Sequence, residues 1–239
     1  MTDAVTVDER VDGDTVSVRR LFDDAGGCEK FAQRILSFGP GRSHQRVEAD
    51  ADEVLYVLDG AATATVAGGE QPLARGTAVF VSKDTPWSIE AERELDILSV
   101  LVFAPAPVPD GTYAVVDLAE EERQTATAAR QFSLGADPAA GCLSVTQFIG
   151  FIPPGRAPDH FHLYDEVLYV LEGQGLVHID GEEAPLAPGS CVHLPAKLVH
   201  CLENVGADEM RILGVFRPAG SPAEAYYPDG TPAVYTAAA

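Results

Sequence analysis

The chain has 239 residues, of which 46% are hydrophobic and 22% are charged, so it can bury the core of one large domain or two small ones. Lys and Arg number 16 against 37 Asp and Glu, which gives a formal net charge of −21. This charge would repel a polyphosphate backbone or an anionic membrane surface. Nucleic acid and membrane are therefore not expected partners.

The N-terminal residues MTDAVTVDER are polar and acidic, without the basic and apolar regions of a signal peptide. No run approaches the roughly 18 apolar residues that span a bilayer. We therefore expect a cytoplasmic protein. Its four cysteines have no CxxC spacing and are expected to be free thiols, mostly buried.

Short apolar runs bounded by Gly, Pro and Asp predict strands in both halves of the chain. In the first half they cover residues 16–20, 31–38, 54–58, 61–66, 78–81 and 95–103. In the second half they cover residues 143–152, 167–171, 175–179, 190–194, 201–204 and 210–216. Between the halves, a Pro-rich connector leads into residues 120–130, where the sequence predicts a short helix.

One segment of the sequence occurs twice. DEVLYVLDG at residues 52–60 returns as DEVLYVLEG at residues 165–173, and the register continues without gaps from 52–76 against 165–189. The repeat predicts a duplicated all-β unit of roughly 100 residues, a size at which closure into a sandwich or small barrel buries the strand edges.

Histidines accumulate only in the second copy. His160 and His162 are two residues apart, so a strand would direct both imidazoles to one face. On a straight strand Glu166 would lie too far along to join them, so the chain is expected to bend at residues 163–165. His200 follows a strand and a turn at Pro195 that would return it to the barrel. Three neutral imidazoles and one carboxylate suit Fe(II), Mn(II), Ni(II) or Zn(II).

These residues resemble the two signatures of the cupin superfamily. The first resemblance is carried by Gly155, His160, His162, Glu166 and Gly173, and the second by Gly189, Pro195, His200 and Asn204. Lys197 stands where the second signature usually has glycine. The resemblance implies an all-β bicupin of two tandem jelly-roll barrels, residues 1–110 and 111–239, with metal ligands His160, His162, Glu166 and His200. Cupins include dioxygenases, decarboxylases, isomerases and proteins that only bind, so the fold does not choose the reaction.

The first copy lacks this ligand set. Arg46 and Glu48 lie near the places of the two histidines, and Trp87 occupies the place of His200. An indole offers only an N–H group, which no cation can use, and the single His44 cannot replace three histidines. We expect the first barrel to hold no metal and to have a structural role. The alternative is a metal-free pocket lined by Trp87, Arg46 and Glu48.

Three further residues are candidates for catalysis. His178 and His193 lie in predicted strands of the second barrel, where they would act as acid–base groups beside the metal or simply be outward-facing strand histidines. Tyr164 lies next to the ligands in sequence, as do Arg156 and Lys197, and would orient an anionic substrate or remain a solvated loop residue.

The expected function is a metal-dependent enzyme that acts on a small organic molecule. Oxygenation of an enolic or phenolic compound with Fe(II) is the first expectation. The alternatives are an oxygen-independent lyase, isomerase or decarboxylase, for which Mn(II), Ni(II) or Zn(II) would serve, and a non-catalytic small-molecule-binding protein. Jelly-roll barrels of this kind often pair, so a homodimer is also expected.

Overall fold

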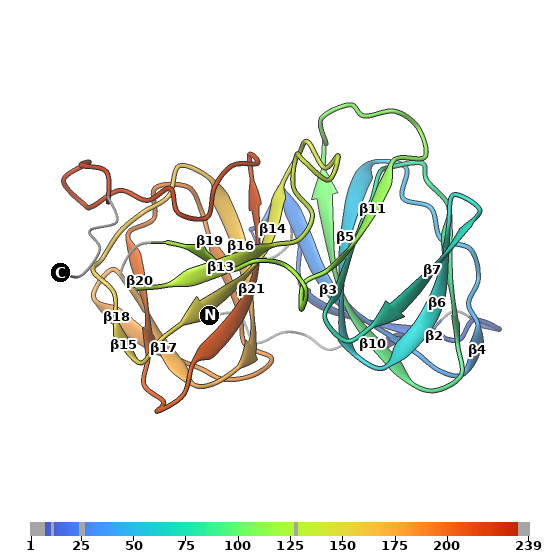
Figure 1. Ribbon diagram of the computed structural model, residues 1–239, viewed down its shortest axis with the longest axis horizontal. Helices are drawn as coiled ribbons and strands as arrows, with labels where there is room; N and C mark the ends of the chain where they lie inside the picture. The colour runs from blue at the N-terminus through green and yellow to red at the C-terminus, as the bar shows by residue number, and fades with distance from the viewer. Residues whose placement is uncertain (1–7, 11, 24–26, 127–128, 234–239) are drawn as a thin grey trace. The chain divides into compact units, whose positions relative to one another are not determined.

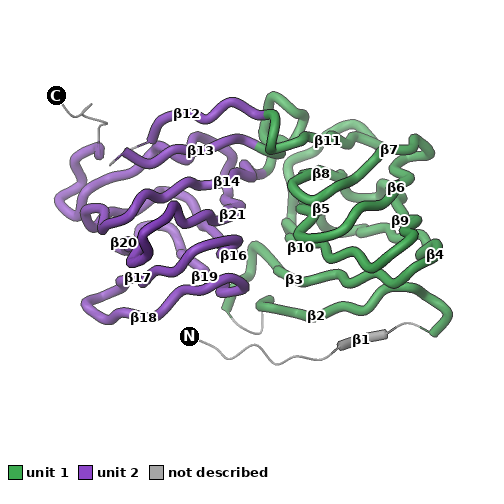
Figure 2. Tube along the Cα trace, turned by 60° about the horizontal axis from the view of Figure 1, so that its bottom comes forward, with its two compact units in different colours: residues 1–120, 135–144 green, residues 121–134, 145–239 purple. Residues whose placement is uncertain are grey.

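The computed structural model describes residues 8–10, 12–23, 27–126 and 129–233 and divides the chain into two compact units. Unit 1 comprises residues 1–120 and 135–144, and unit 2 comprises residues 121–134 and 145–239 (Figure 2). Both units consist of antiparallel strands, and the described residues contain no helix (Figure 1). The predicted all-β fold of two tandem jelly-roll barrels is confirmed.

Unit 1 contains a seven-stranded sheet in the order β1-β2-β3-β10-β5-β8-β11 and a four-stranded sheet in the order β4-β9-β6-β7. Its strands are β1 (Asp8–Arg10), β2 (Val16–Phe22), β3 (Phe31–Phe38), β4 (Gly41–Arg42), β5 (Ala51–Asp59), β6 (Ala61–Val66), β7 (Gly69–Ala74), β8 (Thr77–Val81), β9 (Trp87–Ala91), β10 (Leu95–Phe103) and β11 (Tyr113–Asp117).

Unit 2 contains a six-stranded sheet in the order β12-β13-β14-β21-β16-β19 and a four-stranded sheet in the order β15-β20-β17-β18. Its strands are β12 (Gln124–Thr125), β13 (Gln131–Leu134), β14 (Thr146–Ile152), β15 (Gly155–Arg156), β16 (Asp165–Glu172), β17 (Gly175–Ile179), β18 (Glu182–Leu186), β19 (Cys191–Leu194), β20 (His200–Asn204) and β21 (Met210–Arg217).

The two units repeat one topology. The order β3-β10-β5-β8 of unit 1 matches β14-β21-β16-β19 of unit 2, and β4-β9-β6-β7 matches β15-β20-β17-β18. The repeated segment forms β5 in one unit and β16 in the other, and each ends in a glycine of positive φ, Gly60 (91°) and Gly173 (90°). A Cβ at Gly60 would lie 2.6 Å from the Glu94 carbonyl oxygen, and one at Gly173 would lie 2.8 Å from the Met210 Cα. Only glycine fits this turn in either barrel.

Each barrel encloses its own apolar core. In unit 2, Leu168 and Val170 of β16 point into the core together with Leu194 and Phe216. Glu166 shares their parity on β16 and is also buried. The expected orientation of Glu166, Leu168 and Val170 toward the barrel interior is therefore confirmed.

All twelve predicted strands are present, with ends that differ by up to three residues. The prediction of a short helix at residues 120–130 is wrong for the described part of that segment. The chain turns at Glu120, whose N–H donates to the Asp117 carbonyl, and Gln124–Thr125 then pairs with β13. Pairing with the sheet outweighs the local helical preference, because it satisfies the backbone groups that a helix would have satisfied internally.

The four cysteines are free thiols, and Cys28, Cys142 and Cys201 are buried as expected. Cys191 is partly exposed. Among the residues that the structure describes, there is no helix with the length and hydropathy needed to cross a membrane.

Candidate metal centre

Three histidines of unit 2 converge at one end of the barrel interior. His160 and His200 form an antiparallel bridge, with backbone N–O distances of 3.0 and 2.8 Å in the two directions. The chain bends at residues 163–164 before β16 begins, as the sequence predicted. The imidazole centroids are 5.1 Å apart for His160 and His162, 4.7 Å for His160 and His200, and 5.3 Å for His162 and His200.

The hydrogen bonds of the three rings determine their tautomers. Each Nδ1 lies against a backbone carbonyl oxygen: His160 against Pro158 at 2.9 Å, His162 against Glu224 at 2.7 Å, and His200 against Leu198 at 2.9 Å. A carbonyl only accepts, so each Nδ1 carries the proton and donates. In a neutral ring the lone pair is then on Nε2, the arrangement that metal-binding histidines adopt.

The three rings are neutral at physiological pH. Burial lowers the pKa of His162 to about 4 and that of His200 to about 3, with the neighbouring histidines lowering both further. Burial also lowers the pKa of His160. One nitrogen from each ring lies within 4.8 Å of the others, and no further group of this kind is found in the described part of the chain. These donors fit a divalent transition ion.

Glu166 lines the same pocket but is not one of the three residues whose donor atoms lie within 4.8 Å. Its side chain is buried, and no described residue gives its carboxylate a hydrogen bond or an ion pair. Burial raises the pKa of Glu166 to about 8. A buried carboxyl group without a partner is costly unless it is protonated or meets a cation, so its chemistry also fits a metal site.

The pocket around these residues has a volume of about 70 Å³. Tyr164 lies on its wall, stacked on His162 with ring centroids 4.6 Å apart and on Phe216 at 3.9 Å. Burial raises the pKa of Tyr164 well above its ordinary value, with Glu166 adding to the shift. The phenol is therefore a proton donor at neutral pH.

Residues near the C-terminus complete the centre, and sequence reasoning missed them. Phe161 and Tyr226 exchange backbone hydrogen bonds of 2.8 and 2.9 Å, and their rings stack at 5.6 Å. This bridge holds the carbonyl of Glu224 against His162. The adjacent Tyr226 and Tyr227 were a weak sequence signal for this contact, because a backbone carbonyl leaves no residue-specific signal.

His178 and His193 do not line the pocket. They alternate along β17 and β19 with the core residues Val177 and Leu194, so their side chains leave the opposite faces of these strands. His178 Nε2 lies 2.8 Å from a carboxylate oxygen of Glu203. Of the three candidate catalytic residues, the structure brings only Tyr164 to the histidine cluster.

The two charged neighbours of the ligands lie outside the pocket. The exposed Arg156 pairs with Asp159 at 2.9 Å. Lys197 is exposed at a φ of 68°, the left-handed conformation that glycine favours, and its N–H donates to the His162 carbonyl at 2.7 Å. The glycine position of the cupin signature is thus a left-handed turn that this chain makes with lysine.

The backbone of unit 1 repeats this arrangement residue for residue. Arg46 and Trp87 form the bridge that His160 and His200 form in unit 2. The N–H of Asp84, at a φ of 60°, donates to the Glu48 carbonyl at 2.7 Å. Arg46, Glu48 and Trp87 therefore occupy the places of the three histidines, as the sequence predicted.

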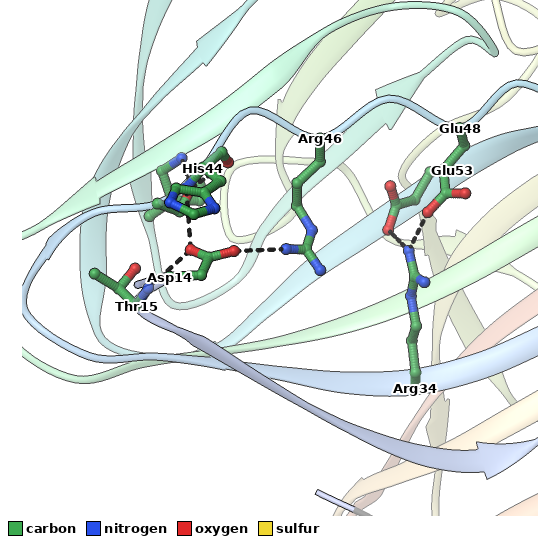
Figure 3. A network of polar contacts seen from close by, with 9 residues as sticks. Asp14, Thr15, Arg34, His44, Arg46, Glu48 and Glu53 are labelled. Carbon is green, nitrogen blue, oxygen red and sulfur yellow. Dashed lines mark hydrogen bonds and ion pairs between the residues drawn. The ribbon is translucent and has the colours of Figure 1, made fainter. Parts of the chain in front are cut away.

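The side chains of unit 1 interact with one another instead of converging on an ion site. The guanidinium of Arg34 donates to Glu48 at 2.7 Å and to Glu53 at 2.9 Å (Figure 3). Glu53 also accepts from Ser99 and, at 3.1 Å, from the indole Nε1 of Trp87. Burial lowers the pKa of Arg34, but Glu53 and Glu48 more than offset this and leave it above its ordinary value. Arg34 therefore supplies the positive charge that faces Glu53 in this barrel.

His44 belongs to no cluster of metal-ligating side chains among the described residues. Asp14 accepts from the backbone N–H of His44 at 3.0 Å and pairs with Arg46 at 3.5 Å (Figure 3). The guanidinium of Arg46 lies 5.9 Å from the ring centroid of Trp87. Arg46, Glu48 and Trp87, which an alternative interpretation assigned to a ligand pocket, are thus engaged in ionic, hydrogen-bond and cation–π contacts.

Comparisons with known proteins agree with this division. Residues 148–216, within unit 2, match the family model of the cupin domain. A 101-residue segment is 32% identical to polyketide synthase CurC of Streptomyces cyaneus and covers 41% of this chain and 66% of that protein. A 64-residue segment is 39% identical to quercetin 2,3-dioxygenase of Bacillus subtilis and covers 26% of this chain and 19% of that one. Matched segments span from 19% to 66% of the curated relatives' lengths.

Solved structures show the same architecture over nearly the whole chain. A mutant of Bacillus subtilis oxalate decarboxylase superposes with a TM-score of 0.73 at 15% identity and covers 90% of this chain and 76% of that one. At this identity the similarity shows the fold alone, which has both barrels in common with this chain.

Proposed function

Since this chain belongs to the cupin superfamily, with its cupin domain in residues 148–216, we propose that it is a metal-dependent enzyme acting on a small organic molecule. One observation carries the proposal. Three histidines, of which His162 and His200 are buried, donate their Nδ1 protons to backbone carbonyls and so direct three Nε2 lone pairs to one place beside a buried carboxyl group. Without a bound ion, these lone pairs and the carboxyl group would lack partners inside the barrel, which is costly.

His160, His162 and His200 would hold the ion, with Glu166 as the fourth ligand once it has lost its proton. A bound divalent ion would supply Lewis acidity and, as Fe(II), also one-electron chemistry toward dioxygen. The histidines are ready for this role because burial has already made them neutral. Glu166 is not, because its pKa of about 8 keeps most of it protonated at pH 7 until a cation approaches.

Tyr164 and the apolar walls shape the space in which a substrate would lie. The phenol of Tyr164 would donate a hydrogen bond to a substrate oxygen. Leu168, Ile152 and Phe148 line the same pocket and exclude water from it, which strengthens the electrostatic interactions inside. His178 and His193 point away from this space and have no role in the proposed reaction.

The first reaction that we propose is Fe(II)-dependent dioxygenation of an enolic or phenolic compound. The similarity to quercetin 2,3-dioxygenase over 64 residues supports it. The test is to load purified protein with Fe(II) and follow dioxygen uptake with quercetin and catechol as probes. Uptake that vanishes in His162→Ala and product formation that stops under argon are expected. If the probes bind to the Fe(II)-loaded protein without turnover, the result would contradict dioxygenation and support a non-catalytic binding protein.

The size of the pocket favours a second candidate, an oxygen-independent lyase, isomerase or decarboxylase using Mn(II), Ni(II) or Zn(II). A volume of about 70 Å³ corresponds to roughly five to seven water-sized probe volumes, which suits a short substrate better than a flavonol. Turnover at an equal rate under argon, with Mn(II) or Zn(II) in place of Fe(II), would establish this candidate and exclude the first.

We also propose that the protein is a cytoplasmic homodimer. The dimer follows from the tendency of jelly-roll barrels to pair, and the location follows from four cysteines that form no disulfide, as in a reducing compartment. Light scattering on the purified chain, whose monomer mass is 25.3 kDa, checks the dimer.

A further inference from the structure

Arg130 places a guanidinium group on the wall of the histidine pocket. It lies just before β13 and lines the pocket with the three histidines, Tyr164 and Glu166. Neither sequence signature includes it, and it precedes His160 by 30 residues. Arg130 and the histidines come together only through the closure of the barrel.

The guanidinium has little to bind among the described residues. One of its terminal nitrogens donates to the carbonyl oxygen of Leu202 at 2.5 Å, and no described carboxylate lies within ion-pair distance of it. Burial lowers the pKa of Arg130. Arg34, its counterpart in chemistry within unit 1, is by contrast held by two carboxylates. A guanidinium has five N–H donors in a planar fork, so most of the donors of Arg130 have no acceptor among the described residues.

The charges in the pocket leave room for an anion. Two charged side chains, Arg130 and Glu166, line the pocket beside the three histidines. A divalent ion and a guanidinium together outweigh one carboxylate. With a divalent ion in the histidine set, the pocket interior would be positive although the chain as a whole carries a formal charge of −21.

We propose that Arg130 is a specificity-determining residue that binds the carboxylate of a short organic acid. This acid carries a second oxygen on the carbon next to the carboxylate, and the second oxygen faces the histidine cluster. The inference rests on the proposed function for the second oxygen, and on Arg130 alone for the carboxylate. A planar carboxylate matches the guanidinium fork in two parallel hydrogen bonds. The small volume of the pocket favours a substrate of a few carbon atoms. The substrate class is then a short 2-oxo or 2-hydroxy acid, or the enolate derived from it.

The test compares pyruvate with pyruvamide, which has nearly the same shape and no charge. Isothermal titration of each probe into metal-loaded protein is expected to show pyruvate bound about 10- to 100-fold more tightly, the usual range for a hydrogen bond to a charged group. Arg130→Met should lose this preference, and Arg130→Lys, which keeps the charge but not the fork, should fall between. Equal binding of acid and amide by the wild type, or an unchanged preference in Arg130→Met, would overturn the proposal.

Two further readouts separate a binding role from a structural one. Metal content should be the same in Arg130→Met and the wild type, because Arg130 is not a ligand. The Tm of metal-free Arg130→Met should equal or exceed that of the wild type, because the substitution removes a half-buried charge that has no counter-ion among the described residues. A lowered Tm together with an unchanged pyruvate preference would assign Arg130 a structural role and reject the proposal.

Failure of the proposed function gives a different result. If the wild type binds no metal ion, the same titrations on the metal-free protein still test Arg130. A preference for pyruvate that disappears in Arg130→Met would support the carboxylate subsite, and an equal affinity for both probes would reject it.

Discussion

The two barrels of this chain have the same strand topology and differ in the group that can neutralise their buried glutamate. Strand pairing shows which residues correspond. Arg34 pairs with Ser99 of β10, and Phe148 pairs with Gly214 of β21, at equivalent places in the two sheets. In unit 1 the cation at this place belongs to the chain, because Arg34 reaches Glu53. In unit 2 the ring of Phe148 lies there instead, and Glu166 has no partner among the described residues.

A second pair of residues completes the exchange. A Cβ at Gly214 would lie 2.2 Å from the ring of Phe148, so the ring is accommodated only over a glycine. In unit 1 the corresponding Ser99 hydroxyl bonds to Arg34 and Glu53. In unit 1 the buried carboxylate of Glu53 is thus paired with a guanidinium of the chain. In unit 2 the buried carboxyl group of Glu166 is available to a bound ion. The difference teaches that a barrel without the histidine set meets the charge of its buried glutamate with a guanidinium of its own, since Arg34 pairs with Glu53.

Removal of the internal cation should be the most damaging change to unit 1. Arg34→Met leaves Glu53 buried without its ion pair, and breaking a buried pair from one side costs about 3 to 5 kcal/mol. Urea denaturation measures this loss. The matched control Arg123→Met breaks the half-exposed pair with Glu209 and should change stability by less than about 1 kcal/mol.

The double variant Arg34→Met/Glu53→Gln sharpens the interpretation. It removes both charges, so it should recover most of the stability lost by Arg34→Met. Equal losses in Arg34→Met and Arg123→Met would show that Arg34 does not have the role of the ion in unit 1.

The pH dependence of the metal-free protein should reveal the opposite situation in unit 2. The folded pKa values of His162 and His200 lie below the ordinary value of 6.5, so stability falls as the pH drops from 6.5 toward 4. Glu166 has a folded pKa of about 8 against an ordinary 4.5, so its contribution is present at low pH and is lost as the pH rises through 8. Above pH 6.5 only the effect of Glu166 remains.

The metal-free protein should therefore be most stable near pH 6.5 and should lose about 2 kcal/mol between pH 6.5 and 8. Denaturation of metal-stripped protein across pH 4 to 9 tests this expectation. Glu166→Gln should abolish the alkaline loss, since an amide has no proton to lose. A loss of the same size in Glu166→Gln would show that another group is responsible.

The C-terminal bridge should contribute a smaller effect, confined to the metal affinity of unit 2. Tyr226→Ala removes the ring that stacks on Phe161 and thereby loosens the carbonyl that orients His162. Loss of an orienting partner weakens metal binding by about 10-fold or more. Competition with a chelator measures the affinity, with Tyr227→Ala as the matched control. An unchanged affinity in Tyr226→Ala would mean that His162 is held without the bridge.

The smallest effect concerns the left-handed turn that both barrels share. Lys197→Gly should raise the free energy of unfolding by about 0.5 to 1 kcal/mol, because glycine adopts a φ of 68° without strain. Asp84→Gly should gain less, since aspartate tolerates this conformation better than lysine. Thermal unfolding of the two variants gives the comparison, and a larger gain for Asp84→Gly would contradict it.

The fold could be predicted because the same strand pattern occurs twice in the sequence, so each copy supports the interpretation of the other. Two copies of DEVLYVL followed by an acid and glycine fix the strand, its buried face and its turn in both barrels. Strands rich in Glu, Gln and Pro, such as β7 and β18, were not predicted, since their apolar residues are too few to show a period. Residues 120–130 were misread because local preference cannot show that Gln124–Thr125 pairs with the neighbouring strand β13, which itself lies against β14 of the barrel sheet.

The candidate site was predictable where spacing along the chain determines geometry. His160, His162 and His200 follow from two short signatures, and the structure brings them together. Arg130, Glu224 and Arg34 were not found, because each reaches its site through barrel closure and has no motif of its own. His178 and His193 were considered because of their residue type, whereas strand alternation decides that they point away.

The most direct test of the central claim is the metal content of three proteins purified without chelators. Elemental analysis should find about one divalent transition ion per chain in the wild type, none in His162→Ala, and the wild-type amount in His44→Ala. This result would assign the ion to the C-terminal barrel alone. Two ions per chain, or a metal content that follows His44 rather than His162, would contradict the account.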